Sequence, residues 1–474
     1  MHKRFTQSLS SALVLGLLAM SAAAVADVPG VAPGIPEPQN RNVIIQLFNW
    51  PFRDIQTVLP QLRQLGYSHV HVSPPQKSNE RVWQWWGRYQ PIDFSVISGP
   101  LGSEEDFQKM NAAAEANGIQ IIADVVPNHT VDINEMPEPD SVVLDNNNRV
   151  VSEKFPQFNP GDIRDRVACG NNVQQCWLFG NLVDLKTEDE RVRKVVRDYL
   201  TKLANLGVDG FRFDAAKHIE PAFFSAVLNV VPDKYAFGEI IETYPNDFSS
   251  HLQTAEMDYY DFPLAATMRE AFGYGGNLTI LKSPQDQGRA LAGTKAVTFV
   301  RNHDIDRGQA GDRGVSDATY GVGWDAGNRQ LNRTDVTLAH AYILGREDGL
   351  PYVFADMPTV PANQKDDRYD DPDIVAGIRF HNLSLANEGG VARRQDIFRI
   401  ETPTVLGWQR GTDRFIVINK ATDWYSIRNL QTSLQPGKYL EVRNGWPMHV
   451  QSNGQIVEWN VPPRSAMRFV RVGN

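Results

Sequence analysis

The sequence predicts an α/β protein built on a (β/α)8 TIM barrel, because short apolar segments alternate with amphipathic helical segments eight times from residue 43 onward. After the third apolar segment, a stretch rich in Asp, Asn, Pro and Gly interrupts the alternation and predicts a small inserted domain. Beyond residue 387, short strand-like segments between turn residues predict a C-terminal antiparallel β-sandwich domain. A doubly wound open sheet is the alternative to the barrel.

The first 40 residues are expected to lie outside the folded core. Lys3 and Arg4 precede an apolar run over residues 12–20, and Ala24-Val25-Ala26 follows, so residues 1–26 are predicted to be a signal peptide. Residues 27–40 form a Pro/Gly-rich lead-in. We expect a secreted protein, extracellular or periplasmic, with no membrane segment in its mature form.

The remaining boundaries follow from the same changes of pattern. The barrel is predicted over residues 41–129 and 188–387, the inserted domain over 130–187, and the sandwich over 388–474. The predicted barrel strands are residues 43–48, 70–73, 119–126, 208–214, 234–239, 257–262, 296–300 and 350–354. Helices are predicted at 54–65, 101–116 and 188–206, and sandwich strands at 405–410, 414–418, 439–442 and 465–470.

Composition and charge limit the classes of partner. Charged residues make up 22% and hydrophobic residues 42% of the chain, as in an ordinary globular protein. The net charge of -9 argues against nucleic acid and anionic membranes as partners. The 10 Trp, 14 Tyr and 22 Phe fit either a large core or stacking on sugars, and the count alone favours the core.

Cys169 and Cys176 lie seven positions apart in the inserted segment. If the protein is exported, an oxidising compartment makes a disulfide between them the expected state. Two free thiols are the alternative. Two cysteines alone are too few for a structural zinc site.

The fourth predicted strand carries charges that a buried strand does not ordinarily hold. Arg212 and Asp214 are two positions apart, so they point to the same face of the strand. A guanidinium next to a carboxylate favours the ionised carboxylate, which is then a candidate nucleophile. A purely structural ion pair is the alternative.

Polar residues gather where the predicted strands end, which is the rim that carries the active site in barrels of this class. Three carboxylates, Asp214, Glu239 and Asp304, should therefore converge, with His129 and His303 beside them. Two carboxyl groups that flank one bond suit glycoside hydrolysis. Asp214 is the expected nucleophile, and Glu239, whose pKa burial should raise, is the expected acid; the spacing does not decide between retention and inversion.

An aromatic segment over residues 83–90 follows the second strand on the same side of the barrel. We expect Trp86 and Tyr89 to form an exposed platform that stacks on a sugar ring, with Gln90 as a further substrate contact, and Trp85 to pack below them. A hydrophobic plug under the loop is the alternative.

Four segments resemble, in chain order, the four sequence motifs of the α-amylase family of glycoside hydrolases: residues 124–129, 210–218, 238–241 and 299–304. Residues 46–50, 72–75 and 85–91 look like the animal-type α-amylases and their bacterial relatives. The resemblance implies a retaining mechanism with Asp214 as nucleophile, Glu239 as general acid/base and Asp304 as transition-state stabiliser. It implies that His129, Arg212 and His303 line the subsite of the broken bond, and that Lys217 and His218 contact the leaving-group side.

The same resemblance implies a structural Ca²⁺ between the barrel and the inserted domain, held by Asn128, Asp184 and the carbonyl of His218. A further carbonyl ligand should fall near Gln174. Animal-type relatives bind chloride through two Arg and an Asn; Arg212 and Asn302 match two of these positions, but Tyr352 stands where the second Arg would fall. We therefore expect no chloride dependence.

These observations predict a secreted, monomeric, endo-acting α-amylase that hydrolyses starch and malto-oligosaccharides. An exo-acting or transglycosylating relative, a non-catalytic glucan-binding protein and a metal-dependent hydrolase are the alternatives. The glycine-rich residues 305–333 are expected to form a loop over the site.

Overall fold

The computed structural model describes residues 28–82, 84–132, 143–144, 150–152, 157–170, 172–306, 331–359, 369–385 and 395–473. The predicted signal peptide, Trp83, and most of the glycine-rich stretch 305–333 lie outside the described residues. In the described part, no helix is both long enough and apolar enough to cross a membrane.

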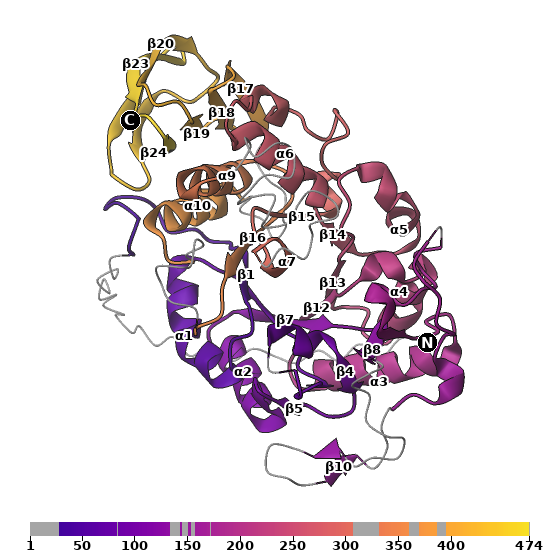
Figure 1. The fold of residues 1–474 in the computed structure, drawn as a ribbon. Coiled ribbons are helices and arrows are strands. Elements are labelled where there is room, and N and C mark those ends of the chain that lie inside the picture. The colour runs from indigo at the N-terminus through magenta and orange to yellow at the C-terminus, as the bar shows by residue number, and fades with distance from the viewer. Residues whose placement is uncertain are drawn as a thin grey trace, which may run out of the picture.

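Eight parallel strands close into a barrel in the order β1-β16-β15-β14-β13-β12-β7-β2, which confirms the predicted TIM barrel and excludes an open sheet (Figure 1). Each predicted barrel strand is present, with ends that differ by a few residues. The strands are β1 (Ile44–Leu47), β2 (His69–Val72), β7 (Gln120–Val125), β12 (Gly210–Phe213), β13 (Tyr235–Gly238), β14 (Asp258–Tyr260), β15 (Ala296–Phe299) and β16 (Leu350–Ala355).

Helices follow the strands and surround the barrel (Figure 1). They are α1 (Phe52–Leu65), α2 (Glu104–Ala116), α3 (Glu190–Asn205), α4 (Pro221–Leu228), α5 (Ser249–Thr254), α6 (Phe262–Phe272), α7 (His303–Asp306), α9 (Arg333–Gly345) and α10 (Pro372–Leu383).

The sequence signals at the helix ends correspond to real caps. Ser103 and Asp106 form the capping box that begins α2, and each side chain accepts a hydrogen bond from the other residue's backbone N–H. Gly66 ends α1 with φ +101°, in the left-handed region that glycine adopts without strain.

The barrel interior contains aromatic side chains below the layer of charged residues. Phe237, Tyr260 and Tyr352 are fully buried, and the Tyr260 ring lies edge-on to Phe237 and Tyr352 at centroid distances of 5.0 and 5.2 Å. His71 from β2 lies 6.0 Å from both Phe237 and Tyr352. These rings fill the barrel, so its interior is a packed core.

The inserted segment between β7 and α3 contains the antiparallel pair β8 (His129–Asp132) and β11 (Leu182–Asp184), and a second pair, β9 (Val143–Leu144) and β10 (Val150–Ser152). The Cys169–Cys176 disulfide is present, as predicted, with an S–S distance of 2.01 Å. Four short strands lie between β2 and α2: β3 (Lys77–Ser78), β4 (Pro91–Asp93), β5 (Ser98–Gly99) and β6 (Gly102–Ser103).

The C-terminal domain is an antiparallel sheet whose eight strands are joined in the order β17-β18-β19-β24-β21-β22-β23-β20. They are β17 (Asp396–Glu401), β18 (Val405–Arg410), β19 (Arg414–Asn419), β20 (Tyr425–Gln431), β21 (Gly437–Glu441), β22 (Pro447–Val450), β23 (Gln455–Val461) and β24 (Ser465–Gly473). Buried side chains from all eight strands share one core, so the sheet folds over on itself. Its first strands pack on the barrel, where Trp408 Nε1 donates to the carbonyl of Gly345 at 3.1 Å.

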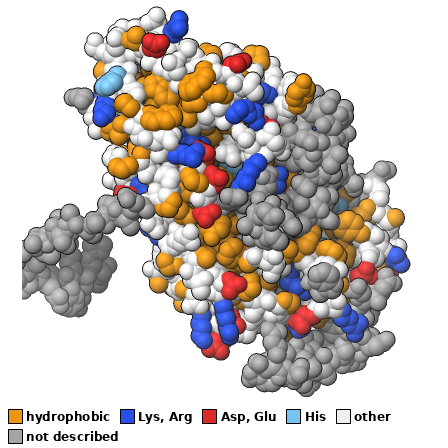
Figure 2. All heavy atoms as spheres, turned by 60° about the vertical axis from the view of Figure 1, so that its left-hand side comes forward, with side chains coloured by type: hydrophobic (Ala, Val, Ile, Leu, Met, Phe, Trp, Pro, Cys, Tyr) orange, Lys and Arg blue, Asp and Glu red, His pale blue; other side chains and the backbone are white. Residues whose placement is uncertain are grey.

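On the face drawn in Figure 2, the described Lys and Arg side chains are interspersed with Asp and Glu, without a broad region of one sign.

Candidate active site

Acidic side chains meet at one rim of the barrel, where the parallel strands end. Asp124 lies near the end of β7, Asp214 and Glu239 directly follow β12 and β13, and Asp304 lies in α7 just after β15. All four are at least nine-tenths buried. The expected convergence of Asp214, Glu239 and Asp304 is therefore present.

Arg212 on β12 lies at the centre of this group and is itself fully buried. Its Nη1 donates to Asp124 Oδ1 and to Asp214 Oδ1, each at 2.8 Å, while its Nη2 donates to Glu239 Oε1. The rings of Tyr89 and Tyr260 cover the guanidinium at 6.0 and 5.8 Å from Cζ. One cation thus holds three carboxylates in fixed positions.

This sharing changes the expected electrostatics of Asp214. The sequence predicts that Arg212 keeps Asp214 ionised, and the ion pair is present, but burial together with Glu239 and Asp124 outweighs it and raises the pKa of Asp214 well above its ordinary value. Burial and the neighbouring Glu239 likewise raise the pKa of Asp304. Both shifts favour the protonated form of these two carboxyl groups.

The backbone after β12 fixes the position of Glu239. Ala215 has φ +49°, an uncommon conformation for a residue with a side chain, and it directs its N–H at Glu239 Oε2 over 3.1 Å. The N–H of Glu239 donates to the carbonyl of Phe213 at 3.0 Å. Glu239 is thus held by Arg212 on one oxygen and by a backbone donor on the other.

Asp304 is supported by its two preceding neighbours. Asn302 Nδ2 donates to Asp304 Oδ2 at 3.1 Å, and His303 Nε2 lies 3.5 Å from Asp304 Oδ1. The His303 ring is stacked between Phe48 and Tyr89, with centroid distances of 4.8 and 5.1 Å and interplanar angles of 15°. Gln46 Nε2 lies 3.0 Å from His303 Nδ1, so His303 Nε2 carries the ring proton and faces Asp304.

The aromatic segment agrees only in part with its prediction. Trp86 is 44% exposed and remains a candidate platform, and Trp85 packs below against Phe48 and His303. The expectation that Tyr89 is exposed was wrong: it is 9% exposed, because its ring stacks on His303 and its hydroxyl donates to Asp124 Oδ2 at 3.0 Å. Tyr89 forms part of the wall that encloses the charged cluster.

Two other predicted substrate contacts are already engaged within the protein. His129 Nε2 donates to the carbonyl of Tyr89 at 3.0 Å, and burial lowers the pKa of His129 to about 4, so its ring is neutral. Gln90 Oε1 accepts from Asn79 Nδ2 at 2.8 Å. Sugar contacts by either side chain remain predictions, and they would compete with these internal bonds.

The residues predicted for the leaving-group side lie in the 3-10 turn after β12. Lys217 forms an ion pair with Glu242 at 2.6 Å, and its backbone N–H donates to the carbonyl of Glu239 at 3.2 Å. His218 Nδ1 donates to the carbonyl of Val173 at 2.8 Å. The inserted segment therefore reaches this side of the rim through Val173, next to Gln174.

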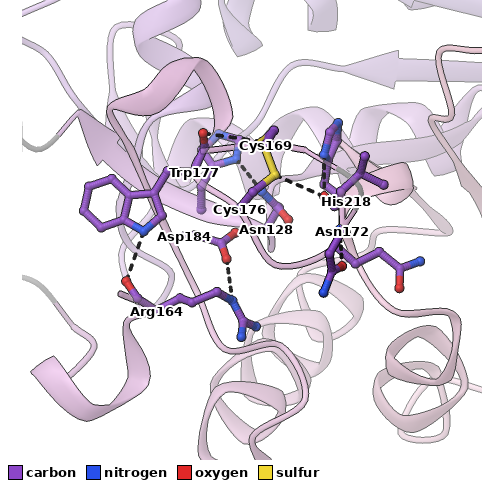
Figure 3. Close-up of a disulfide and its surroundings, with 11 residues drawn as sticks. Asn128, Arg164, Cys169, Asn172, Cys176, Trp177, Asp184 and His218 are labelled. Carbon is purple, nitrogen blue, oxygen red and sulfur yellow. Dashed lines mark hydrogen bonds and ion pairs between the residues drawn. A yellow bond between two sulfur atoms is a disulfide. The ribbon is translucent and has the colours of Figure 1, made fainter. Parts of the chain in front are cut away.

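The residues predicted to hold a cation surround the disulfide loop (Figure 3). Asp184 on β11 lies opposite His129 in the strand pair β8–β11, and the N–H of Leu185 donates to the carbonyl of Asn128 at 3.0 Å. Asn128 Nδ2 donates to His129 Nδ1 at 3.3 Å, and the buried Asn128 Oδ1 has no hydrogen-bond partner among the described residues. An unpartnered buried oxygen next to a buried carboxylate suits a hard cation such as Ca²⁺.

Asp184 itself is almost fully buried, and burial raises its pKa to about 7, although Arg164 Nε pairs with its Oδ2 at 2.8 Å. The sulfurs of Cys169 and Cys176 lie within 4.8 Å of a His218 ring nitrogen, but they are joined in a disulfide and do not act as thiolate ligands.

Sequence reasoning assigned no role to several side chains that complete the site. Asp124, on the neighbouring strand, forms an ion pair with Arg212. Gln46 contacts His303 Nδ1 and fixes the orientation of the His303 ring. The signal for Asp124 is its place at the end of an apolar strand, the same signal that identified Asp214. The inward-facing polar groups of His71 and Tyr352 have no such signal, since both residues occur within ordinary apolar strand patterns.

Comparisons with known proteins agree with this arrangement. Residues 52–310 match the model of the α-amylase catalytic domain. An α-amylase of Aeromonas hydrophila is 30% identical over 457 residues, covering 85% of this chain and 92% of that protein. An α-amylase of Tenebrio molitor is also 30% identical, over 443 residues and 89% of its length.

Among solved structures, an α-amylase from Eisenia fetida in complex with maltohexaose has the same fold, with a TM-score of 0.72 and 21% identity over 93% of this chain and 99% of that chain. An α-amylase of Malbranchea cinnamomea superposes with a TM-score of 0.71 at 17% identity, over 91% of this chain and 96% of that chain. The fold, the motif-bearing strands and the relatives agree, and the chain belongs to the α-amylase family of glycoside hydrolases.

Proposed function

We propose that the protein is a secreted, endo-acting α-amylase that cleaves internal α-1,4-glucosidic bonds of starch with retention of configuration. The observation that carries this proposal is the shared guanidinium of Arg212, which holds Asp214 and Glu239 on adjacent Nη atoms within a buried cluster of carboxylates. Two carboxyl groups fixed together in this way can supply both a nucleophile and a proton donor.

In the proposed first step, an Asp214 oxygen attacks the anomeric carbon while Glu239 gives its proton to the glycosidic oxygen, which leaves with the departing chain. In the second step, Glu239 takes a proton from water, and the water oxygen displaces Asp214 from the anomeric carbon. The Asp304 carboxylate, oriented by Asn302, stabilises the positive charge that develops on the sugar ring. That charge also favours the ionised form of Asp214, which opposes the effect of burial on its pKa.

Starch and malto-oligosaccharides are the proposed substrates. The maltohexaose complex of the Eisenia fetida relative supports this choice, and the exposed Trp86 offers a face on which a glucose ring can stack. We propose the monomer as the active form. An exo-acting or transglycosylating enzyme of the same family is the second candidate, since both would use the same carboxylates.

Calcium is the proposed structural ion. Asn128 Oδ1, the Asp184 carboxylate and the carbonyl of His218 would hold it, and when bound it would neutralise buried negative charge and tie the inserted segment to the barrel. Chloride is not proposed as a cofactor, because Tyr352 occupies the position of the second Arg. Activity measured as chloride is titrated into chloride-free buffer tests this point, and strong activation would contradict it.

The main experiment compares the wild-type protein with Asp214→Asn on soluble starch, with the anomeric form and length of the products as readouts. Mixed short α-anomeric products from the wild type, and their loss in the variant, are the expected result. β-Anomers would contradict the role of Asp214. A single product length would favour the exo-acting candidate, and wild-type protein that binds glucan without releasing products would favour a binding protein.

A further inference from the structure

Below the charged rim, three fully buried polar side chains form a chain of contacts inside the barrel. Tyr260 Oη donates to Tyr352 Oη at 2.6 Å, and Tyr352 Oη lies 2.7 Å from His71 Nδ1. His71 Nε2 lies 3.4 Å from Asp124 Oδ2. The chain therefore leads from β14 through β16 and β2 to the carboxylate on β7 that also binds Arg212.

The direction of the hydrogen bonds follows from the donors available. Tyr352 accepts the hydroxyl proton of Tyr260, so it donates its own proton to His71 Nδ1. His71 then carries its proton on Nε2, facing Asp124. The reversed direction would aim the Nε2 lone pair at a carboxylate and is excluded electrostatically. Burial lowers the pKa of His71, which keeps the ring in this neutral form.

We propose that the Tyr260–Tyr352–His71 chain is a positioning relay that partly neutralises Asp124 and so leaves more of the charge of Arg212 to Asp214 and Glu239. Asp124 Oδ2 already accepts from Tyr89 at 3.0 Å and from Arg212 Nη1 at 3.0 Å. The His71 Nε2–H faces Asp124 Oδ2 over 3.4 Å, longer than a well-formed hydrogen bond, and acts on it as an electrostatic contact. Its positive end reduces the negative potential that Asp124 projects onto the two neighbouring carboxyls.

Charged and titratable groups from several barrel strands surround the relay and the carboxyls beside it. His71 faces Asp124 on β7, Arg212 on β12, Glu239 after β13 and Tyr352 on β16. Asp214 faces Arg212, Asp124, Glu239 and Tyr89. Asp304 faces Glu239, Arg212, Asp214, Tyr89 and His303. Burial raises the pKa of both Asp214 and Asp304, and Arg212 is the cation that lowers it. A weaker donor to Asp124 therefore makes the electrostatic potential at Asp214 and Glu239 more negative.

The inference rests on the roles proposed for Asp214 and Glu239, because it concerns their protonation during catalysis. Its test is the pH dependence of kcat/KM for a short maltoside in the variant Tyr352→Phe. Loss of the hydroxyl weakens the donor to Asp124, the site becomes more negative, and both limbs of the profile should move to higher pH by about half a unit. Tyr260→Phe should give a smaller shift of the same sign.

The double variant Tyr352→Phe/His71→Phe distinguishes an effect of Tyr352 that passes through His71 from an effect of Tyr352 that does not. If Tyr352 acts only through His71, the double variant should show the same profile as His71→Phe alone. Tyr342→Phe is the matched control: Tyr342 is a buried tyrosine on α9 whose hydroxyl donates to the carbonyl of Leu281 at 2.7 Å, away from this chain. It should lower the Tm and leave the pH profile unchanged.

A spectroscopic measurement is independent of activity. ¹⁵N-histidine NMR of the wild-type protein should show, beside the signals of His129 and His303, a further neutral Nε2–H tautomer that disappears in His71→Phe. A profile unchanged in Tyr352→Phe, a shift to lower pH, or an Nδ1–H tautomer would overturn the relay. Failure of the underlying function would instead appear as retained hydrolysis in Asp214→Asn, with the tautomer unchanged.

Discussion

Arg212 Nη1 lies 2.8 Å from Asp214 Oδ1, and the guanidinium that makes this contact has no exposed surface. Since the same cation also holds Asp124 and Glu239, its planar shape matters as much as its charge. Arg212→Lys would keep the charge and lose the simultaneous contacts. We expect kcat/KM to fall by on the order of 10²–10³-fold, since charge-assisted bonds to both reacting carboxyls are lost.

Arg410→Lys provides the control for Arg212→Lys. Arg410 is a buried arginine of the C-terminal domain whose Nη1 donates to the carbonyl of Gly345 at 2.7 Å. The Arg410→Lys substitution should lower the Tm and keep kcat/KM near the wild-type value. Comparable kcat/KM values in the two variants would show that Arg212 acts through stability alone.

Removal of calcium should lower stability. If Asn128 Oδ1 and Asp184 hold the ion, a chelator leaves these two buried groups without their cation. We therefore expect the Tm to fall by several degrees and to recover when Ca²⁺ is added back. Differential scanning calorimetry measures this directly. In Asn128→Ala the response to the chelator should be much smaller.

The control for the calcium prediction is Asn382→Ala, which removes a buried amide that donates to the carbonyl of Gly66 at 2.9 Å. It should lower the Tm but respond to the chelator like the wild type. A wild-type Tm that is identical with and without the chelator would argue that Arg164, which already pairs with Asp184, is the only cation at this site.

Replacement of Trp86 tests whether this exposed ring stacks on a sugar ring of the substrate. It is 44% exposed next to the charged rim, so replacing it with Ala should remove a stacking surface and leave the carboxylates in place. We expect KM for malto-oligosaccharides to rise by about fivefold, with a small change in kcat, since one stacking contact contributes about 1 kcal/mol. Trp424→Ala, at a 64% exposed position in the C-terminal domain, is the control. Equal KM values in both variants would remove Trp86 from the site.

The barrel could be predicted because most residues of its strands are apolar and buried, and because capping residues such as Ser103 mark where the intervening helices begin. The C-terminal domain was harder. Strands β20 and β23 place polar side chains on an exposed face and alternate irregularly around Asn429, whose φ is +51°, so neither strand showed a clear period of two.

The candidate catalytic carboxylates could be predicted because strand ends converge in a barrel. The contact of Arg212 with Asp124 could not, since it depends on β7 and β12 being neighbours in the sheet although 88 residues separate the two side chains. Tyr89 was misjudged for a related reason: an aromatic residue in a loop has the same sequence pattern whether it faces solvent or packs on His303.

The last prediction concerns acid stability and uses a histidine remote from the catalytic rim. His69 begins β2, at the opposite end of the barrel strand from the rim, and burial lowers its pKa from the ordinary value of 6.5 to about 4. Because its folded pKa is depressed, the unfolded chain binds more protons between pH 6.5 and 4, so stability is lost as the pH falls through this window. The full shift corresponds to at most about 3 kcal/mol.

The pKa values of His71, His129 and His251 are lowered as well, so His69→Gln should reduce the loss of Tm in acid without abolishing it. Replacing the exposed His449 should leave the loss of Tm in acid unchanged. If the Tm–pH curves of His69→Gln and the wild type run parallel from pH 7 to 4, the folded-state ring of His69 titrates as it does in the unfolded chain and the predicted contribution is absent.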